Sequence, residues 1–208
     1  MSHSKAAVQA TTNQADAAHE EHIDMEEVRT FGFWIYLMTD IIIFGVLFAT
    51  FIVLRQNYDG GPTPKDLIEI GGIIVSTFIL LTSSYTSGLA VLSMNKGNKN
   101  GLIGWLAVTA LLGASFLYLE ISEFVHLVNA GASIGTSAYW SSFFTLVGTH
   151  GIHIVIGLIW MIGIIIQISK RGITPVTKRK VNVISLFWHF LDIVWIFVLT
   201  LVYLLGVS

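Results

Sequence analysis

Residues 185–206 read SLFWHFLDIVWIFVLTLVYLLG and are apolar almost throughout. A helix that crosses a membrane needs about 20 mostly apolar residues, so this segment is long enough to span. It nevertheless contains two ionisable side chains, His189 and Asp192, three positions apart. Ionisable groups inside a membrane are costly and usually face neighbouring helices. The segment therefore predicts one member of a bundle of transmembrane helices.

The rest of the chain has the same character. Of its 208 residues, 54% are hydrophobic and only 12% are charged, and the mean hydropathy is +0.74. Soluble domains carry about 25% charged residues, so this composition is typical of an integral membrane protein. The connectors between apolar segments are short and leave no room for a soluble domain. We predict an all-α, polytopic membrane protein, a five-transmembrane-helix bundle, with spans at about residues 31–54, 70–94, 102–128, 139–169 and 183–206.

The first thirty residues differ from this membrane domain, which we place at residues 31–208. Residues 1–30 contain six acidic and two basic side chains and lack the apolar run of a signal peptide. They cannot bury enough apolar surface to offset the entropy of ordering, so we predict a disordered acidic tail in the cytoplasm. The irregular spacing of its three histidines favours a solvated tail over a metal site.

Two absences exclude classes of function. The chain has no cysteine, which excludes thiolate-ligated iron–sulfur clusters and haem attached through Cys-x-x-Cys-His. With a net charge of −2 it also lacks the basic footprint of a protein that binds nucleic acid, so no such partner is expected.

Basic residues in the connectors predict the orientation. The N-terminal tail, residues 95–101 and residues 170–182 carry nine bases, whereas residues 55–69, residues 129–138 and the C-terminus carry two. Because cytoplasmic loops are enriched in lysine and arginine, the N-terminus is predicted to be cytoplasmic and the C-terminus periplasmic. The expected location is a bacterial inner membrane.

Eight ionisable side chains lie within the predicted spans. They are Asp40, Glu120, Glu123, His126, His150, His153, His189 and Asp192. Helical spacing puts His150 and His153 on one face, and His189 and Asp192 on another. Glycines beside such residues let helices approach closely enough to hydrogen-bond. The simplest interpretation is polar contact between helices, in a chain without a catalytic, cofactor or metal site.

Three chemical alternatives remain open. His150 and His189 could ligate haem b from facing helices, although each has a polar neighbour three positions away that suits pairing better. A di-iron site needs Glu-x-x-His on two helices, and only residues 123–126 match. Carboxylates near the midplane, such as Asp40 and Asp192, could serve a proton-coupled transporter. Against transport, all three prolines lie in connectors, so no proline breaks a span.

Three stretches together resemble subunit III of the haem-copper terminal oxidases. They are FGFWIYLMTDIIIFGVLFATF (31–51), TLVGTHGIHIVIGLIWM (145–161) and the C-terminal segment 185–206. The connector GGPTPKD and the stretch LYLEISEFVHL fit as well. Five spans rather than seven make the chain most similar to subunit III of cytochrome bo-type ubiquinol oxidase. The likeness runs from about residue 31 to the end.

The resemblance implies a non-catalytic subunit of a proton-pumping quinol oxidase of the aerobic respiratory chain, which oxidises quinol and reduces oxygen to water. It implies that haem and copper belong to subunit I, and that this chain is part of an enzyme only within the complex. The main partner would be subunit I, with subunits II and IV and membrane lipids as further partners. A phospholipid cleft and a role in assembly and stability are also implied.

The same resemblance assigns roles to single residues. Asp40 stands where many relatives carry a membrane-buried glutamate. The other matches are to polar residues that line helix interfaces and the lipid cleft: Glu123, His150, His153, His189 and Asp192.

Overall fold

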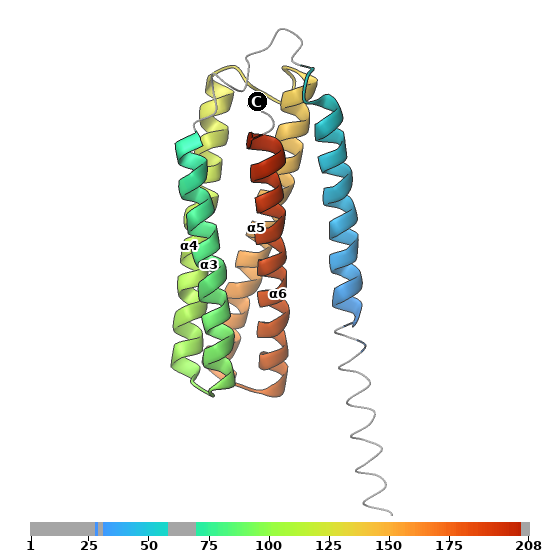
Figure 1. The fold of residues 1–208 in the computed structure, drawn as a ribbon. Helices are drawn as coiled ribbons and strands as arrows, with labels where there is room; N and C mark the ends of the chain where they lie inside the picture. The colour runs from blue at the N-terminus through green and yellow to red at the C-terminus, as the bar shows by residue number, and fades with distance from the viewer. Residues whose placement is uncertain (1–27, 29–30, 58–69, 205–208) are drawn as a thin grey trace, which may run out of the picture. The chain divides into compact units, whose positions relative to one another are not determined.

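The computed structural model describes residue 28, residues 31–57 and residues 70–204 (Figure 1). Within these ranges the regular structure is helical and contains no strand. The tail at residues 1–30 lies outside the described residues apart from Val28, so its disorder stays a prediction.

Five helices of the described chain are long and apolar enough to cross a membrane. They are Phe31–Leu54, α3 (Ile70–Asn95), α4 (Lys99–Asn129), α5 (Ala138–Arg171) and α6 (Pro175–Phe197), and α6 continues into a π-helical segment, η1 (Val198–Leu204). The prediction of an all-α protein with five spans is confirmed.

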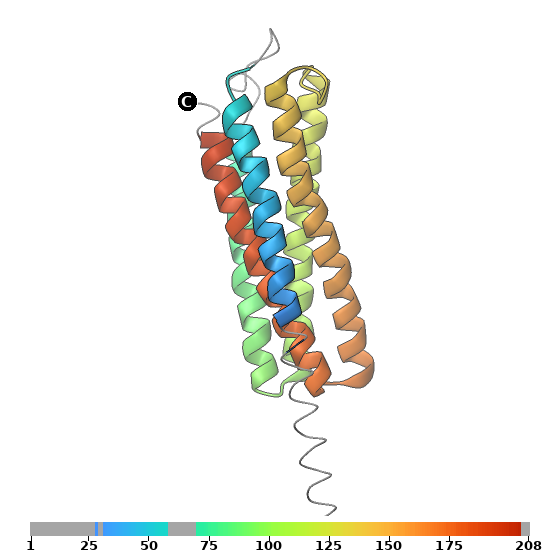
Figure 2. The same ribbon diagram turned by 90° about the vertical axis from the view of Figure 1, so that its right-hand side faces the viewer.

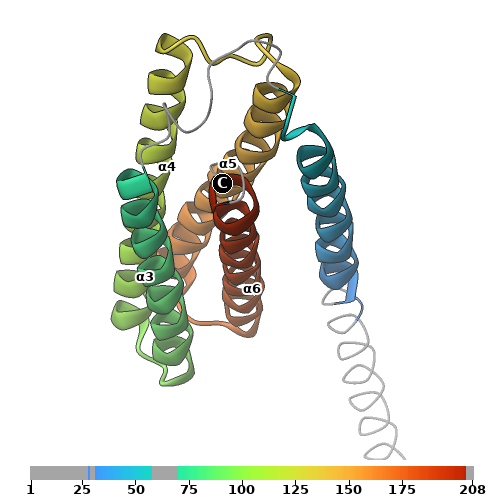
Figure 3. The ribbon, with the colours of Figure 1, turned by 45° about the horizontal axis from the view of Figure 1, so that its top comes forward.

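The chain forms two compact units, residues 1–42 and residues 43–208, and the boundary falls inside the first helix. In the second unit α3 packs against α4, α4 against α5, α5 against α6, and α6 against α3, so that the four helices close a ring. Figure 2 shows α4 and α5 running side by side, and Figure 3 shows α5 passing behind α6, which packs against both α3 and α5. Neighbours along the chain are antiparallel because the connectors are short.

The start of α6 differs from the hydropathy pattern. Hydropathy places it near residue 183, but the helix begins at Pro175, a residue suited to the first helical position because it needs no hydrogen bond to its nitrogen. Thr174 and Thr177 form a capping box that satisfies the first backbone N–H groups. Gly172, with φ of 73°, allows the tight turn from α5. The bases at 178–180 are therefore helical rather than part of a loop.

Trp188 of α6 contacts the other three helices of the ring. A Cβ on Gly113 of α4 would lie 2.7 Å from its indole carbons, and one on Gly157 of α5 would lie 3.1 Å away. The indole is 1% exposed, and its Nε1 donates a hydrogen bond of 3.0 Å to Ser83 Oγ of α3. One side chain thus fills the centre of the ring.

Residues 43–54, the part of the first helix that belongs to the second unit, pack on the outside of this ring. Phe44 lies 6.3 Å from Phe190 of α6, and Phe51 lies 5.5 Å from Tyr139 of α5, measured between ring centroids. Both phenylalanines are almost completely buried. Aromatic packing therefore holds this segment to α5 and α6.

Candidate functional site

His150 of α5 lies inside a group of aromatic rings. It is completely buried, and its imidazole stacks on the indole of Trp195 with centroids 5.4 Å apart and planes 27° apart. The rings of Phe44 and Phe116 meet it edge-on at 6.4 and 6.2 Å. Neither of its ring nitrogens has a hydrogen-bond partner in the described part of the chain. Ring packing, rather than the hydrogen bond expected from its spacing, accounts for its position.

The carboxyl group of Glu120 lies beside the next residue of α5. A Cβ on Gly151 would be 3.1 Å from Oε1 of Glu120, so a larger residue here would require this carboxyl group to shift by a few tenths of an ångström. Glu120 is 6% exposed, and within the described ranges neither of its oxygens has a hydrogen-bond partner. Glu123 stands one turn further along α4 and close enough to interact electrostatically. Tyr203 of η1 reaches Glu123 with a hydrogen bond, so this carboxyl pair lies where α4, α5 and η1 meet.

The other two histidines of α4 and α5 have different surroundings. Nδ1 of His153 lies 2.8 Å from the Thr149 carbonyl oxygen, so Nδ1 carries the proton and donates to the preceding turn. His126 is exposed in the last turn of α4, where a charged imidazole interacts favourably with the helix dipole. His126 therefore stands apart from the buried polar residues.

A seam of side-chain hydrogen bonds joins α3 to α6. Its pairs are Thr77 with Trp195 (3.1 Å), Ser83 with Trp188 (3.0 Å), Ser84 with His189 (2.6 Å) and Ser87 with Ser185 (3.0 Å). A role for these α3 hydroxyls was not predicted from the sequence, because only ionisable side chains were considered and serine and threonine carry no charge. Their concentration within residues 77–87 of one apolar span is the signal that could have found them.

His189 and Asp192 are the one predicted pair that the structure brings together on α6. Nδ1 of His189 lies 3.9 Å from Oδ2 of Asp192 and hydrogen-bonds to Ser84, whereas neither carboxylate oxygen of Asp192 has a hydrogen-bond partner in the described part of the chain. Asp40 belongs to the first unit, where Tyr36 donates a hydrogen bond to it from the preceding turn.

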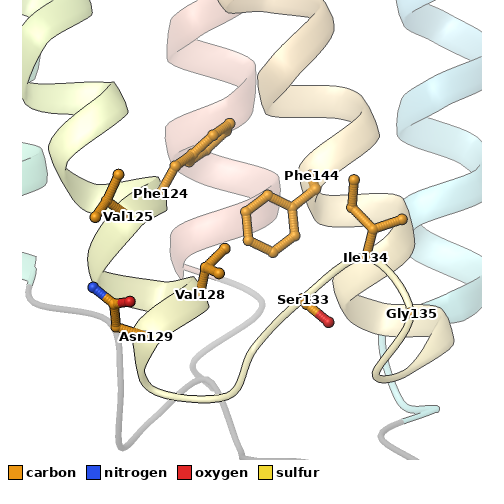
Figure 4. A pocket seen from close by; sticks show the side chains of 8 residues that line it. All are labelled: Phe124, Val125, Val128, Asn129, Ser133, Ile134, Gly135 and Phe144. Atoms are coloured by element: carbon orange, nitrogen blue, oxygen red, sulfur yellow. The ribbon is translucent and has the colours of Figure 1, made fainter.

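An apolar recess opens at the end of α4 (Figure 4). It has a volume of about 520 Å³ and is lined by Phe124, Val125, Val128, Asn129, Ser133, Ile134, Gly135 and Phe144. None of the eight predicted polar residues lines it. Over the described residues, no three His, Cys, Asp or Glu side chains are arranged to hold a metal ion.

Comparison with known proteins places this architecture in a family. The family model described as Cytochrome c oxidase subunit III matches residues 8–207. The chain belongs to this family. The match starts at residue 8, so the similarity reaches into the acidic tail, further than the motifs alone indicate.

Within this family, the chain is similar to relatives that are named as subunits of quinol oxidases. The chain is 49% identical to the quinol oxidase subunit 3 of Bacillus spizizenii over 199 aligned residues. The alignment covers 96% of this chain and 98% of the relative. It is 49% identical over 197 residues to the cytochrome bo(3) ubiquinol oxidase subunit 3 of Pseudomonas aeruginosa, covering 95% and 94%. The resemblance to an oxidase subunit III is thereby confirmed.

Proposed function

We propose that this chain is the accessory subunit III of a membrane-bound quinol oxidase, a complex that oxidises quinol and reduces oxygen to water. The observation that carries this proposal is the near-complete match to relatives named as quinol oxidase subunits. Within the complex the chain supports assembly and stability and carries out no redox step itself.

The interior of the second unit is consistent with a packing role. Trp188 and Trp195 fill the ring, and their indole nitrogens are paired with hydroxyls of α3. In a membrane, where apolar surface drives helix association only weakly, close packing and such hydrogen bonds hold a bundle together. The aromatic and hydroxyl side chains therefore supply what a stable accessory subunit needs.

The wider arrangement of the complex is part of the proposal. Haem and copper belong to subunit I, which is the main partner and conserves energy by pumping protons, and subunits II and IV complete the assembly. The N-terminus lies in the cytoplasm of a bacterial cell. The recess of Figure 4 is lined mainly by hydrocarbon side chains, with Asn129 and Ser133 as polar groups, which suits one end of a phospholipid.

A haem-binding role for His150 is not favoured by its surroundings. An axial ligand needs one ring nitrogen facing the plane of the macrocycle, whereas Phe44, Phe116 and Trp195 enclose this imidazole. A haem at this position would have to displace these rings. The buried site therefore supports packing over ligation.

Purification of the tagged chain from its native membranes tests the proposal. We expect large chains that contain haem and copper to co-purify, together with quinol oxidase activity. The isolated chain, separated from them in detergent, should show no Soret band. A chain that purifies alone, or that retains a Soret band after separation, would contradict the assignment.

A further inference from the structure

Seven basic side chains gather at one end of the helix ring. Residues 95–101, between α3 and α4, carry two bases, and residues 170–182, which include the turn from α5 to α6, carry five. Figure 1 shows both connectors at the same end of the second unit. We name the bases of these two segments the basic surface. Neither segment contains an aspartate or a glutamate, so no neighbour in the sequence offsets their charge.

Two lysines join the helix ends that carry the basic surface. Nζ of Lys99, at the start of α4, donates a hydrogen bond of 2.9 Å to the Ser169 carbonyl oxygen near the end of α5. Nζ of Lys180 on α6 donates a hydrogen bond of 2.8 Å to Oε1 of Gln167 on α5. The capping box at Thr174 fixes the first turn of α6. The basic surface is thus held in place by three helices.

The basic surface has no counter-charge in the ring itself. Four of its members are exposed and form no ion pair with any described residue: Lys96, Lys170, Arg171 and Lys178. In the described part of the second unit, the carboxylate nearest along the chain to any of the seven bases is Asp192, twelve residues beyond Lys180. At 1.5 Å per residue this is about 18 Å along the helix, too far for an ion pair. The balancing negative charge therefore comes from outside the helix ring.

The exposed face of α5 shows where these bases lie relative to lipid. Ile156, Ile159, Ile162 and Ile166 are exposed and lead along the helix toward Lys170. Charged side chains are costly in hydrocarbon, so the boundary of the hydrocarbon core falls between Ile166 and Lys170. The rise from Ile156 to Ile166 is about 15 Å, half of a core about 30 Å thick. One leaflet of acyl chains thus covers this face, and its headgroups lie at the basic surface.

The charge balance selects the class of lipid. A zwitterionic phospholipid brings an ammonium group together with its phosphate, so it adds no net negative charge. A net-anionic phospholipid brings the phosphate alone, and lysine and arginine donate strong, charge-assisted hydrogen bonds to phosphate oxygens. Clusters of four to eight lysines and arginines directly beside a transmembrane helix are typical of binding to anionic lipids.

We propose that the basic surface and the adjoining aliphatic face of α5 bind a net-anionic phospholipid. The exposed bases hold its phosphate, and an acyl chain lies along Ile159 and Ile166. The site lies at the opposite end of α4 from the recess in Figure 4. It does not depend on the assignment of the chain to an oxidase.

Lipid retention by the tagged protein, purified from its native membranes, tests this site. One variant combines Lys170→Gln, Arg171→Gln and Lys178→Gln, and a control combines Lys170→Arg, Arg171→Lys and Lys178→Arg, which keeps every charge. Each protein is stripped of lipid in detergent and offered equal amounts of phosphatidylglycerol and phosphatidylethanolamine, and the bound lipid is measured by mass spectrometry. We expect the glutamine variant to retain several-fold less phosphatidylglycerol than the other two proteins. Phosphatidylethanolamine should be bound equally by all three.

Other results of this experiment would overturn the proposal. Equal phosphatidylglycerol in the wild type and the glutamine variant would show that these bases hold no lipid. Complete displacement of phosphatidylglycerol by an excess of inorganic phosphate would show that the surface binds free anions instead. Loss of a partner polypeptide from the glutamine variant, with its lipid content unchanged, would assign the surface to an acidic protein segment.

Photo-cross-linking on α5 supplies a second readout. A photoreactive amino acid replaces Ile166, next to the bases, or Ile152, toward the other end of the same helix, and both positions are exposed. In native membranes we expect the lipid adducts of Ile166 to be several-fold richer in phosphatidylglycerol than those of Ile152. This enrichment should disappear in the glutamine variant. Adducts of the same composition at both positions, or an adduct of Ile166 with a polypeptide, would contradict the site.

Discussion

The imidazole of His150 and the indole of Trp195 lie nearly parallel, with centroids 5.4 Å apart and planes 27° apart. Phe116 meets the indole at almost a right angle, with centroids 4.7 Å apart. Offset and edge-on contacts of this kind add to the free energy gained from burial alone. The flat shape of the histidine ring is therefore what this site requires.

Replacement of His150 should reveal this dependence on shape. His150→Phe keeps a planar ring and should lower the stability of the complex only slightly, whereas His150→Ala leaves a cavity that should cost about 2–5 kcal/mol. Thermal unfolding of the purified complex, followed by retention of this subunit, measures both changes. The haem spectrum should stay the same in each variant. A phenylalanine variant less stable than the alanine variant would point to the ring nitrogens instead.

The two glycines beside Trp188 should not tolerate even a methyl group. Gly113→Ala places a Cβ 2.7 Å from the indole, and overpacking of a buried site costs about 1–3 kcal/mol. Gly157→Ala should be milder because its closest approach is 3.1 Å. Gly104→Ala is the control on α4, since no atom lies within 4 Å of its Cβ. Equal unfolding midpoints for the Gly113 and Gly104 variants would show that Trp188 can move aside.

His189 and Asp192, which lie next to each other on α6, should be energetically coupled. Polar contacts between membrane helices contribute on average about 0.6 kcal/mol and at most about 1.7. His189→Ala and Asp192→Ala should each lower stability by this amount, and the double variant should cost less than the sum because the two side chains approach within 3.9 Å of each other. Initial rates of quinol oxidation and the haem spectrum should be retained. Loss of a haem band from the His189→Ala complex, with the subunit still bound, would revive the haem-ligand alternative.

The orientation of the chain can be read with reporters. The excess of bases on one side predicts that Ser208 is periplasmic. A reporter active only in the periplasm should be active when fused after Ser208, and inactive when fused within residues 95–101. The opposite pattern would reverse the orientation.

The spans were predictable from the sequence, but the start of the last helix was not. Lipid requires long apolar segments, so hydropathy finds them. The first two turns of α6 project from that segment and carry polar and basic side chains, which hydropathy assigns to a loop. The capping residues Thr174 and Thr177 were the available signal.

The candidate site was predictable only in part. Spacing along one helix put His189 beside Asp192, and the structure agrees. Spacing does not say what the facing helix offers, so the rings around His150 and the α3 hydroxyls could not be derived. The π-helical turn of η1, which brings Tyr203 toward Glu123, likewise has no signature in hydropathy.

The position of Trp188 also bears on the order in which the chain is made. Ser83, Gly113 and Gly157, which surround its indole, belong to helices that leave the ribosome before α6 does. Until the last span is synthesised, the space between these three helices is not filled by Trp188, and the hydroxyl of Ser83 has only its hydrogen bond to the Thr109 carbonyl of α4. The centre of the subunit is therefore completed in the final step of translation, and a nascent chain that stops short of residue 188 cannot close it.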